Sequence, residues 1–217
     1  MQHDHDVHTN EPLLRAGPAI ADARLVAIRL HGRGATVENI LGLSREFTAP
    51  NVAYLAPKRR NTPGIPIPSL RLSSKNEPNP SSALRLIARL LHDLQQQNVP
   101  LKRVALLGFS QGACLTLEFA ARHAQRYAAV VALSGGLIGP SGTPRHYSGS
   151  FGATPVFMGC SDVDSHVPVK RVHESAEVFR RMGATVDERI YRGMAHTVNS
   201  DEIEAVDALL SIMARLK

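Results

Sequence analysis

A chain of 217 residues can bury one sizeable hydrophobic core but is short for two domains. Its 43% hydrophobic and 20% charged residues are typical of a globular protein, and no run reaches the roughly 18 apolar residues of a membrane span. The net charge of +6 suggests nucleic-acid binding, but the basic residues are mostly scattered arginines without interleaved aromatic residues. We therefore expect a solvated basic surface and no nucleic-acid partner.

Residues 1–20 are predicted to be a mobile tail, and residues 21–217 a single domain. Histidines alternate with aspartates in this tail and could bind a metal ion loosely, but nothing nearby would fix the geometry, so no metal site is expected. The tail has neither the basic nor the apolar segment of a secretory signal. Two cysteines, Cys114 and Cys160, make no disulfide framework. A cytoplasmic protein with buried free thiols is expected.

Apolar runs alternate with helical spacings along the rest of the chain. Strands are predicted at residues 25–30, 51–55, 104–107, 128–133, 155–159 and 185–191. Helices are predicted at residues 37–47, 81–94, 169–182 and 201–216, with a further one directly after residue 112. Several of the strands are apolar throughout, which favours a mostly parallel sheet with helices on both faces.

Two stretches depart from this alternation. Residues 56–80 form a long proline-rich loop with an apolar centre at Ile65, Ile67 and Leu70. Because so long a loop in a compact domain is usually functional, we expect these three side chains to wall an apolar substrate groove. Arg29 lies inside the first strand, where a covered sheet leaves little room for charge. It either reaches a carboxylate along the strand, or the strand is wetter than the pattern indicates.

The pentapeptide Gly108-Phe109-Ser110-Gln111-Gly112 stands between an apolar strand and a helical pattern. Strand, sharp turn and helix form the context of a nucleophile elbow, in which a strained serine is lifted clear of the sheet. The glycines let strand and helix pass closely, and the N–H of Gln111 comes to lie at a helix N-terminus, a natural anion site. Taken alone, the pentapeptide could also be an ordinary glycine-rich turn.

Three further polar motifs follow predicted strands. They are His31-Gly32-Arg33-Gly34, the segment from Asp162 to Asp164, and His196 after the last strand. The carboxyl ends of parallel strands meet at one edge, so we expect these motifs to lie beside Ser110. The chain order Ser, Asp, His is that of the α/β-hydrolases.

The chemistry explains these residue types. An imidazole at His196 could take the proton of Ser110, and a buried carboxylate would fix the tautomer of the ring. Either Asp162 or Asp164 could supply that carboxylate; we favour Asp164, which lies nearer the middle of its loop. The backbone N–H groups of Gln111 and Arg33 are the predicted donors of an oxyanion hole.

With these motifs, the chain from about residue 25 onward resembles the small carboxylesterase/phospholipase family of α/β-hydrolases, which includes the acyl-protein thioesterases. The resemblance rests on the four motifs 31–34, 108–112, 164–168 and 193–196. It implies an α/β fold without a large cap domain, no cofactor, and short to medium acyl esters or thioesters as substrates. Many members form dimers. The Asp-x-x-Val-Pro spacing of the family again favours Asp164.

The sequence therefore predicts a serine carboxylesterase that acts on small-molecule esters through an acyl-enzyme. Alternatives are an acyl thioesterase, a lysophospholipase-type hydrolase, or a catalytically silent α/β-hydrolase that binds a ligand. The loop at 61–72 departs from the resembled family, whose members often carry a Trp-Tyr pair there, whereas this chain has no Trp at all. The departure leaves the identity of the acyl and leaving groups open.

Overall fold

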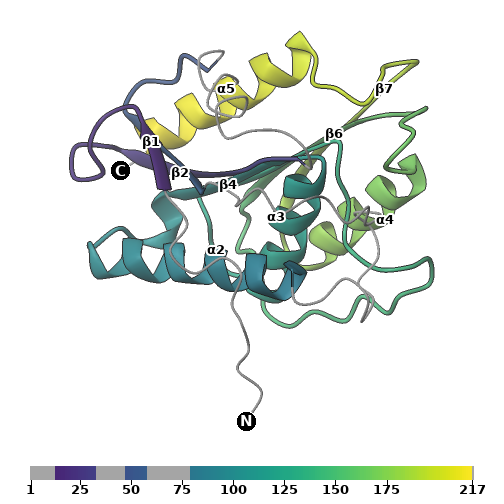
Figure 1. Ribbon diagram of the computed structural model, residues 1–217, viewed down its shortest axis with the longest axis horizontal. Helices are drawn as coiled ribbons and strands as arrows, with labels where there is room; N and C mark the ends of the chain where they lie inside the picture. Colours follow the sequence, from purple (N-terminus) through teal and green to yellow (C-terminus); the bar gives the residue numbers. More distant parts are fainter. Residues whose placement is uncertain (1–12, 33–46, 58–78, 217) are drawn as a thin grey trace.

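The computed structural model describes residues 13–32, 47–57 and 79–216 (Figure 1). They contain a seven-stranded sheet of order β1-β3-β2-β4-β5-β6-β7. The strands are β1 (Leu13–Ala16), β2 (Leu25–Leu30), β3 (Val52–Pro57), β4 (Val104–Phe109), β5 (Ala129–Leu133), β6 (Pro155–Ser161) and β7 (Thr185–Tyr191). Every neighbouring pair is parallel except β1 and β3, which confirms the predicted mostly parallel sheet.

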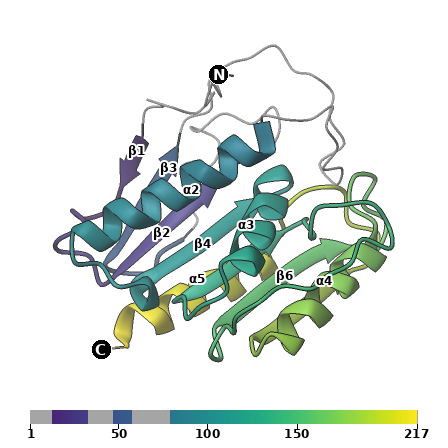
Figure 2. The ribbon, with the colours of Figure 1, turned by 90° about the horizontal axis from the view of Figure 1, so that it is seen from below.

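Four α-helices and one short 3₁₀ helix join the strands in the described part of the chain. They are α2 (Asn79–Gln96), η1 (Leu101–Arg103), α3 (Gln111–Arg122), α4 (Val169–Arg181) and α5 (Ser200–Arg215). Helices α2, α3 and α4 cover one face of the sheet, and α5 covers the other (Figure 2). Both faces are therefore covered, as the apolar strands predict.

Alternate residues of the central strands supply the two cores. In β2, Val26 and Ile28 pack on the α2–α3–α4 face, whereas Leu25 and Ala27 pack on the α5 face. Because β2 to β5 are covered on both sides, their carboxyl ends and the loops that follow them are the parts of the strands open to a substrate. The strand register aligns these ends, pairing Leu30 with Gly108.

Strand β1 differs from the prediction, which placed residues 1–20 in a mobile tail. Leu13–Ala16 pairs antiparallel with β3 and extends the sheet by one edge strand. Its side chains are only partly buried, so its four residues carry no strong apolar pattern. The predicted helix at 37–47, apart from Phe47, and most of the proline-rich loop, with Ile65, Ile67 and Leu70, lie outside the described residues.

No helix in the described ranges combines the length and the apolar character that a bilayer crossing needs.

Candidate active site

Ser110 lies at the turn between β4 and α3, with φ 54° and ψ −120°. This is a strained backbone conformation for a residue other than glycine, and such strain is typical of functional turns. The flanking glycines let backbones pass closely, since a Cβ added at Gly108 would lie 2.3 Å from the Gly112 carbonyl carbon. One added at Gly112 would lie 2.1 Å from the Leu30 carbonyl oxygen, in the neighbouring strand β2. The strand–turn–helix context predicted for the pentapeptide is thus present.

A chain of hydrogen bonds joins side chains from three strand ends. His196, in the loop between β7 and α5, places its Nε2 2.8 Å from the Ser110 Oγ. Its Nδ1 lies 2.6 Å from Oδ2 of Asp164, in the loop after β6. With its proton on Nδ1, the imidazole donates to Asp164 and accepts from the Ser110 hydroxyl.

The Asp164 carboxylate has no solvent-exposed surface, and both of its oxygens accept hydrogen bonds. Oδ1 accepts from the backbone N–H groups of His166, at 2.7 Å, and Val167, at 2.9 Å. Oδ2 accepts from His196 and, at 3.7 Å, from the Cys160 thiol. Burial alone would raise the pKa of Asp164, but the hydrogen bonds from His196, His166 and Val167 outweigh it and hold the pKa below its ordinary value. This carboxylate is therefore built to stay ionised.

The other candidate carboxylate, Asp162, is exposed and contacts a different atom. Its Oδ1 accepts a hydrogen bond of 2.8 Å from the backbone N–H of Gly193. Gly193 belongs to the loop that carries His196, so Asp162 ties the two loops together without bonding to the imidazole.

Two aromatic side chains flank the His196 ring. Phe109, from the pentapeptide, lies 5.2 Å away between ring centroids, and His166 lies 4.6 Å away with its edge toward the His196 ring. Val163, between the two aspartates, is 64% exposed, a large value for an apolar side chain. Phe109 and His166 therefore give the surroundings of the His196 ring both apolar and imidazole surface. The sequence alone indicates no role in the site for His166, Val163 or Cys160. Their proximity to Asp164 in the chain is the one signal that could have singled them out.

The predicted oxyanion donors are placed only in part. Gln111 is the first residue of α3, so its backbone N–H lies at a helix N-terminus beside Ser110. Gly32 packs directly on the serine, since a Cβ added there would lie 3.1 Å from the Ser110 Cβ. His31 places its Nδ1 2.9 Å from the Gly32 carbonyl oxygen within the same loop. Arg33, the next residue, lies outside the described residues.

A second serine, Ser134, directly follows strand β5 and precedes two glycines. It also has a positive φ of 51°, but it is fully buried and its Oγ lies 3.4 Å from the Thr197 carbonyl oxygen. A buried hydroxyl that faces a backbone carbonyl is poorly placed to attack a substrate. Both cysteines are buried as well, and burial raises the pKa of Cys114 to about 11 and that of Cys160 to about 12. Neither is placed as a reactive thiolate.

Among the described residues, no group of three or more His, Cys, Asp or Glu side chains is arranged to hold a metal ion.

A mostly parallel sheet with a strained serine between strand and helix, bonded through histidine to aspartate, defines the α/β-hydrolase class. Residues 18–214 match the phospholipase/carboxylesterase family model, and the chain belongs to that family. The resemblance noted in the sequence is thereby confirmed.

Known relatives agree with this assignment. The crystal structure of a phospholipase/carboxylesterase from Dyadobacter fermentans is 35% identical, with a TM-score of 0.87, and the match covers 93% of this chain and 96% of that one. The Bacillus cereus carboxylesterase shares the fold, with a TM-score of 0.73 at 15% identity over 94% of this chain and 95% of that one. Acyl-protein thioesterase 1 of Saccharomyces cerevisiae is 29% identical over 57% of this chain and 55% of its own length. The chain thus spans about half the length of the first curated relatives that it matches.

Proposed function

We propose that this protein is a serine carboxylic-ester hydrolase that acts on short to medium acyl esters. The observation that carries the proposal is the chain of hydrogen bonds from Ser110 through His196 to Asp164. These three residues lie together at the carboxyl edge of the sheet. A serine hydroxyl is a poor nucleophile until a neighbouring base can take its proton, and here Nε2 of His196 lies within hydrogen-bond distance of it.

In the proposed mechanism, Ser110 attacks the ester carbonyl carbon while its proton passes to Nε2 of His196. The tetrahedral oxyanion is stabilised by the backbone N–H groups of Gln111 and Arg33. The imidazolium then protonates the leaving alcohol, and the acyl group stays on the Ser110 oxygen. A water molecule, activated by the same imidazole, releases the acid and restores the serine.

Asp164 orients this cycle without exchanging protons. Its Oδ2 accepts a hydrogen bond from the Nδ1–H of His196, which leaves Nε2 available as the base and stabilises the positive imidazolium when it forms. Because four donors surround the buried carboxylate, its position is fixed in both stages of the reaction.

A thioester is the second candidate substrate, because several relatives carry the name acyl-protein thioesterase 1. The same site could cleave either bond, since both pass through a tetrahedral oxyanion and an acyl-serine. A cytoplasmic location and a homodimer are further parts of the proposal. Many members of the resembled family form dimers, and sedimentation of the purified protein would test this state.

Two measurements test the proposal. A serine-directed fluorophosphonate should label the wild type at Ser110, and the enzyme should hydrolyse nitrophenyl esters or acyl thioesters of graded chain length. The variant Ser110→Ala should fold normally, escape labelling and lose about 10³-fold or more in kcat. The variant Ser134→Ala is the matched control and should keep its activity. An unlabelled, inactive wild type would instead indicate a silent α/β-hydrolase that only binds its ligand.

A further inference from the structure

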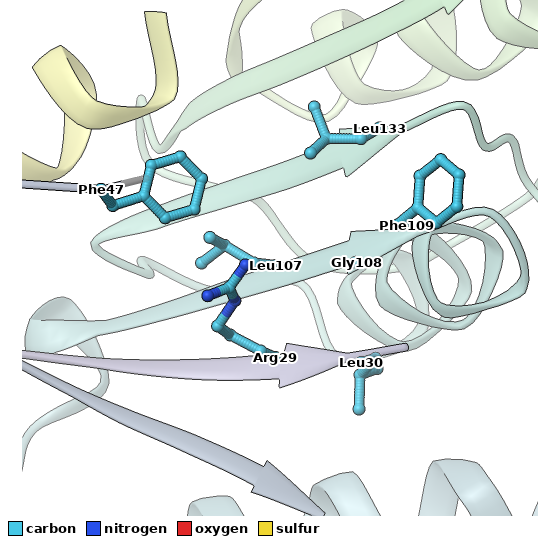
Figure 3. A pocket seen from close by; sticks show the side chains of 7 residues that line it. All are labelled: Arg29, Leu30, Phe47, Leu107, Gly108, Phe109 and Leu133. Carbon is cyan, nitrogen blue, oxygen red and sulfur yellow. The ribbon is translucent and has the colours of Figure 1, made fainter. Parts of the chain in front are cut away.

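A small pocket lies under the elbow, on the face of the sheet that α5 covers (Figure 3). Its walls include the apolar side chains of Phe47, Leu107, Phe109 and Leu133, and the guanidinium of Arg29 is its charged group. The free space fits a single water-sized sphere. Phe109 also contacts His196, so the pocket lies one side chain away from the candidate active site.

Arg29 is buried in strand β2, with 3% of its surface exposed. Its guanidinium carbon lies 5.1 Å from the ring centroid of Phe47 and 5.5 Å from that of Tyr54. Among the residues that the structure describes, its buried Nη1 has no hydrogen-bond partner, and neither has the Tyr54 hydroxyl. In the described part of the chain, no carboxylate pairs with this guanidinium. The carboxylate partner that the sequence left open for Arg29 is thus not found there.

The charge nevertheless persists. Burial lowers the pKa of Arg29 to about 10, which still leaves the group protonated at neutral pH. A buried cation without a counter-charge is costly, and cation–π contacts with two rings recover only part of that cost. An anion that contacts Nη1 of Arg29 would therefore stabilise the folded protein, because it would supply the missing counter-charge.

The pocket also restricts which anion fits. Apart from Arg29, the described residues of its walls supply apolar surface and no second polar side chain for a polyatomic anion such as phosphate. The space for one small sphere favours a monatomic anion over a polyatomic one. We propose that the pocket bounded by Arg29, Phe47 and Phe109 binds one monovalent anion of chloride size, held by Nη1 of Arg29.

Thermal unfolding provides the first test. An anion that binds only the folded protein raises its stability, so chloride at about tenfold over Kd should raise Tm by about 3–6 °C relative to sodium gluconate at equal ionic strength. In Arg29→Met this chloride-specific shift should vanish. The matched control Arg24→Met removes an exposed arginine that directly precedes the same strand and should keep the shift.

Crystals of the wild type grown in sodium bromide provide a second test that needs no variant. An anomalous bromide peak within about 3.5 Å of Nη1 would support the proposal. A pocket that holds water alone, with equal chloride and gluconate Tm values for the wild type, would overturn it. A chloride shift that persists in Arg29→Met would overturn it as well, because the anion would then bind elsewhere.

Discussion

At the scale of single residues, the two aspartates of the loop after β6 make different contacts. Asp164 is buried and bonds to the imidazole of His196, whereas Asp162 is exposed and bonds to the backbone of Gly193. The side chains stand two residues apart, and an extended backbone would put both on the same side. They reach different partners because the chain turns at Asp162 and Val163. Asp164 can set the tautomer of the ring, and Asp162 can only set the position of the loop.

The variants Asp164→Asn and Asp162→Asn should therefore differ greatly. Asparagine at 164 should favour the wrong imidazole tautomer and lower kcat by about 10⁴-fold, as in other serine triads. Asparagine at 162 keeps an oxygen that can accept from Gly193, so we expect a loss of about tenfold or less. Both kcat values are measured at pH 8 on one activated ester, with circular dichroism as the folding control. A large loss only in Asp162→Asn would move the orienting role to that residue.

The contacts of Asp164 also show which residues of the site could be predicted from the sequence and which could not. Ser110, Asp164 and His196 could be selected because each follows a strand, in an order that is typical of one fold class. Cys160 and His166 could not, because their contacts with Asp164 and His196 depend on how the loop after β6 folds back over the sheet. The surroundings of Arg29 were equally hidden, since they are set by Phe47 and Tyr54 from other segments.

At the scale of elements, the start of α5 is tied to the loop that carries His196. Asn199 Oδ1 accepts from the Glu202 N–H at 2.9 Å, and Glu202 Oε2 accepts from the Asn199 N–H at 3.0 Å, which completes a capping box. The Glu202 carboxyl group is fully buried against β6, where a Cβ added at Gly159 would lie 2.1 Å from its Oε1. Burial raises the pKa of Glu202 to about 7, against a smaller lowering by the Asn199 N–H.

This raised pKa predicts a pH-dependent stability. Between about pH 4.5 and 7 the folded protein holds a proton on Glu202 that the unfolded chain has released, so stability falls as the pH rises. The variant Glu202→Gln cannot ionise. Relative to the wild type, its free energy of unfolding should increase by about 3 kcal/mol between pH 4.5 and 8. Urea unfolding at both pH values measures the difference.

The control for this experiment is Glu204→Gln, which changes an exposed carboxylate on the same helix. Its stability relative to the wild type should stay nearly constant over the same pH range. If Glu202→Gln behaved in the same way, Glu202 would be ionised in the folded protein throughout, and the buried carboxyl group would have to be solvated.

The proline-rich loop supports a second prediction at this scale, on the proposal that it walls the acyl groove. Each buried methylene of an acyl chain contributes about 0.8 kcal/mol. The variants Ile65→Ala and Ile67→Ala should therefore reduce kcat/KM for octanoate esters several-fold more than for acetate esters. Equal losses at every chain length would mean that the loop does not contact the acyl group.

Strands and helices could be predicted wherever one pattern covered the whole element. Apart from Arg29 in β2, the central strands are apolar because both faces are covered, and β7 was predicted with the bounds that the structure has. Strand β1 was missed for the opposite reason. It pairs on one side only, and its side chains are half-buried. Backbone pairing with β3, and not an apolar pattern, therefore holds this strand in the sheet.

At the scale of the whole molecule, the net charge of +6 raises the question of whether the protein binds a polyanion. Binding to duplex DNA requires several cations that are free to contact phosphates along one face. In the described part of the chain, five arginines are paired with carboxylates. The pairs are Arg122 and Arg145 with Glu118, Arg171 with Glu174, Arg180 with Glu177 and Glu188, and Arg189 with Asp187 and Asp201.

Weak, salt-sensitive attraction is therefore the most that we expect toward nucleic acid. At about 0.15 M salt, the Kd for a labelled DNA duplex should be weaker than about 10⁻⁴ M, the weak end of non-specific binding. Fluorescence anisotropy measures it, with an oligolysine peptide as the positive control. A Kd in the micromolar range, together with a steep loss of affinity as salt rises, would mean that unpaired basic residues form a continuous phosphate-binding surface. The net charge would then serve a polyanionic partner, a role that the ester-hydrolase proposal does not include.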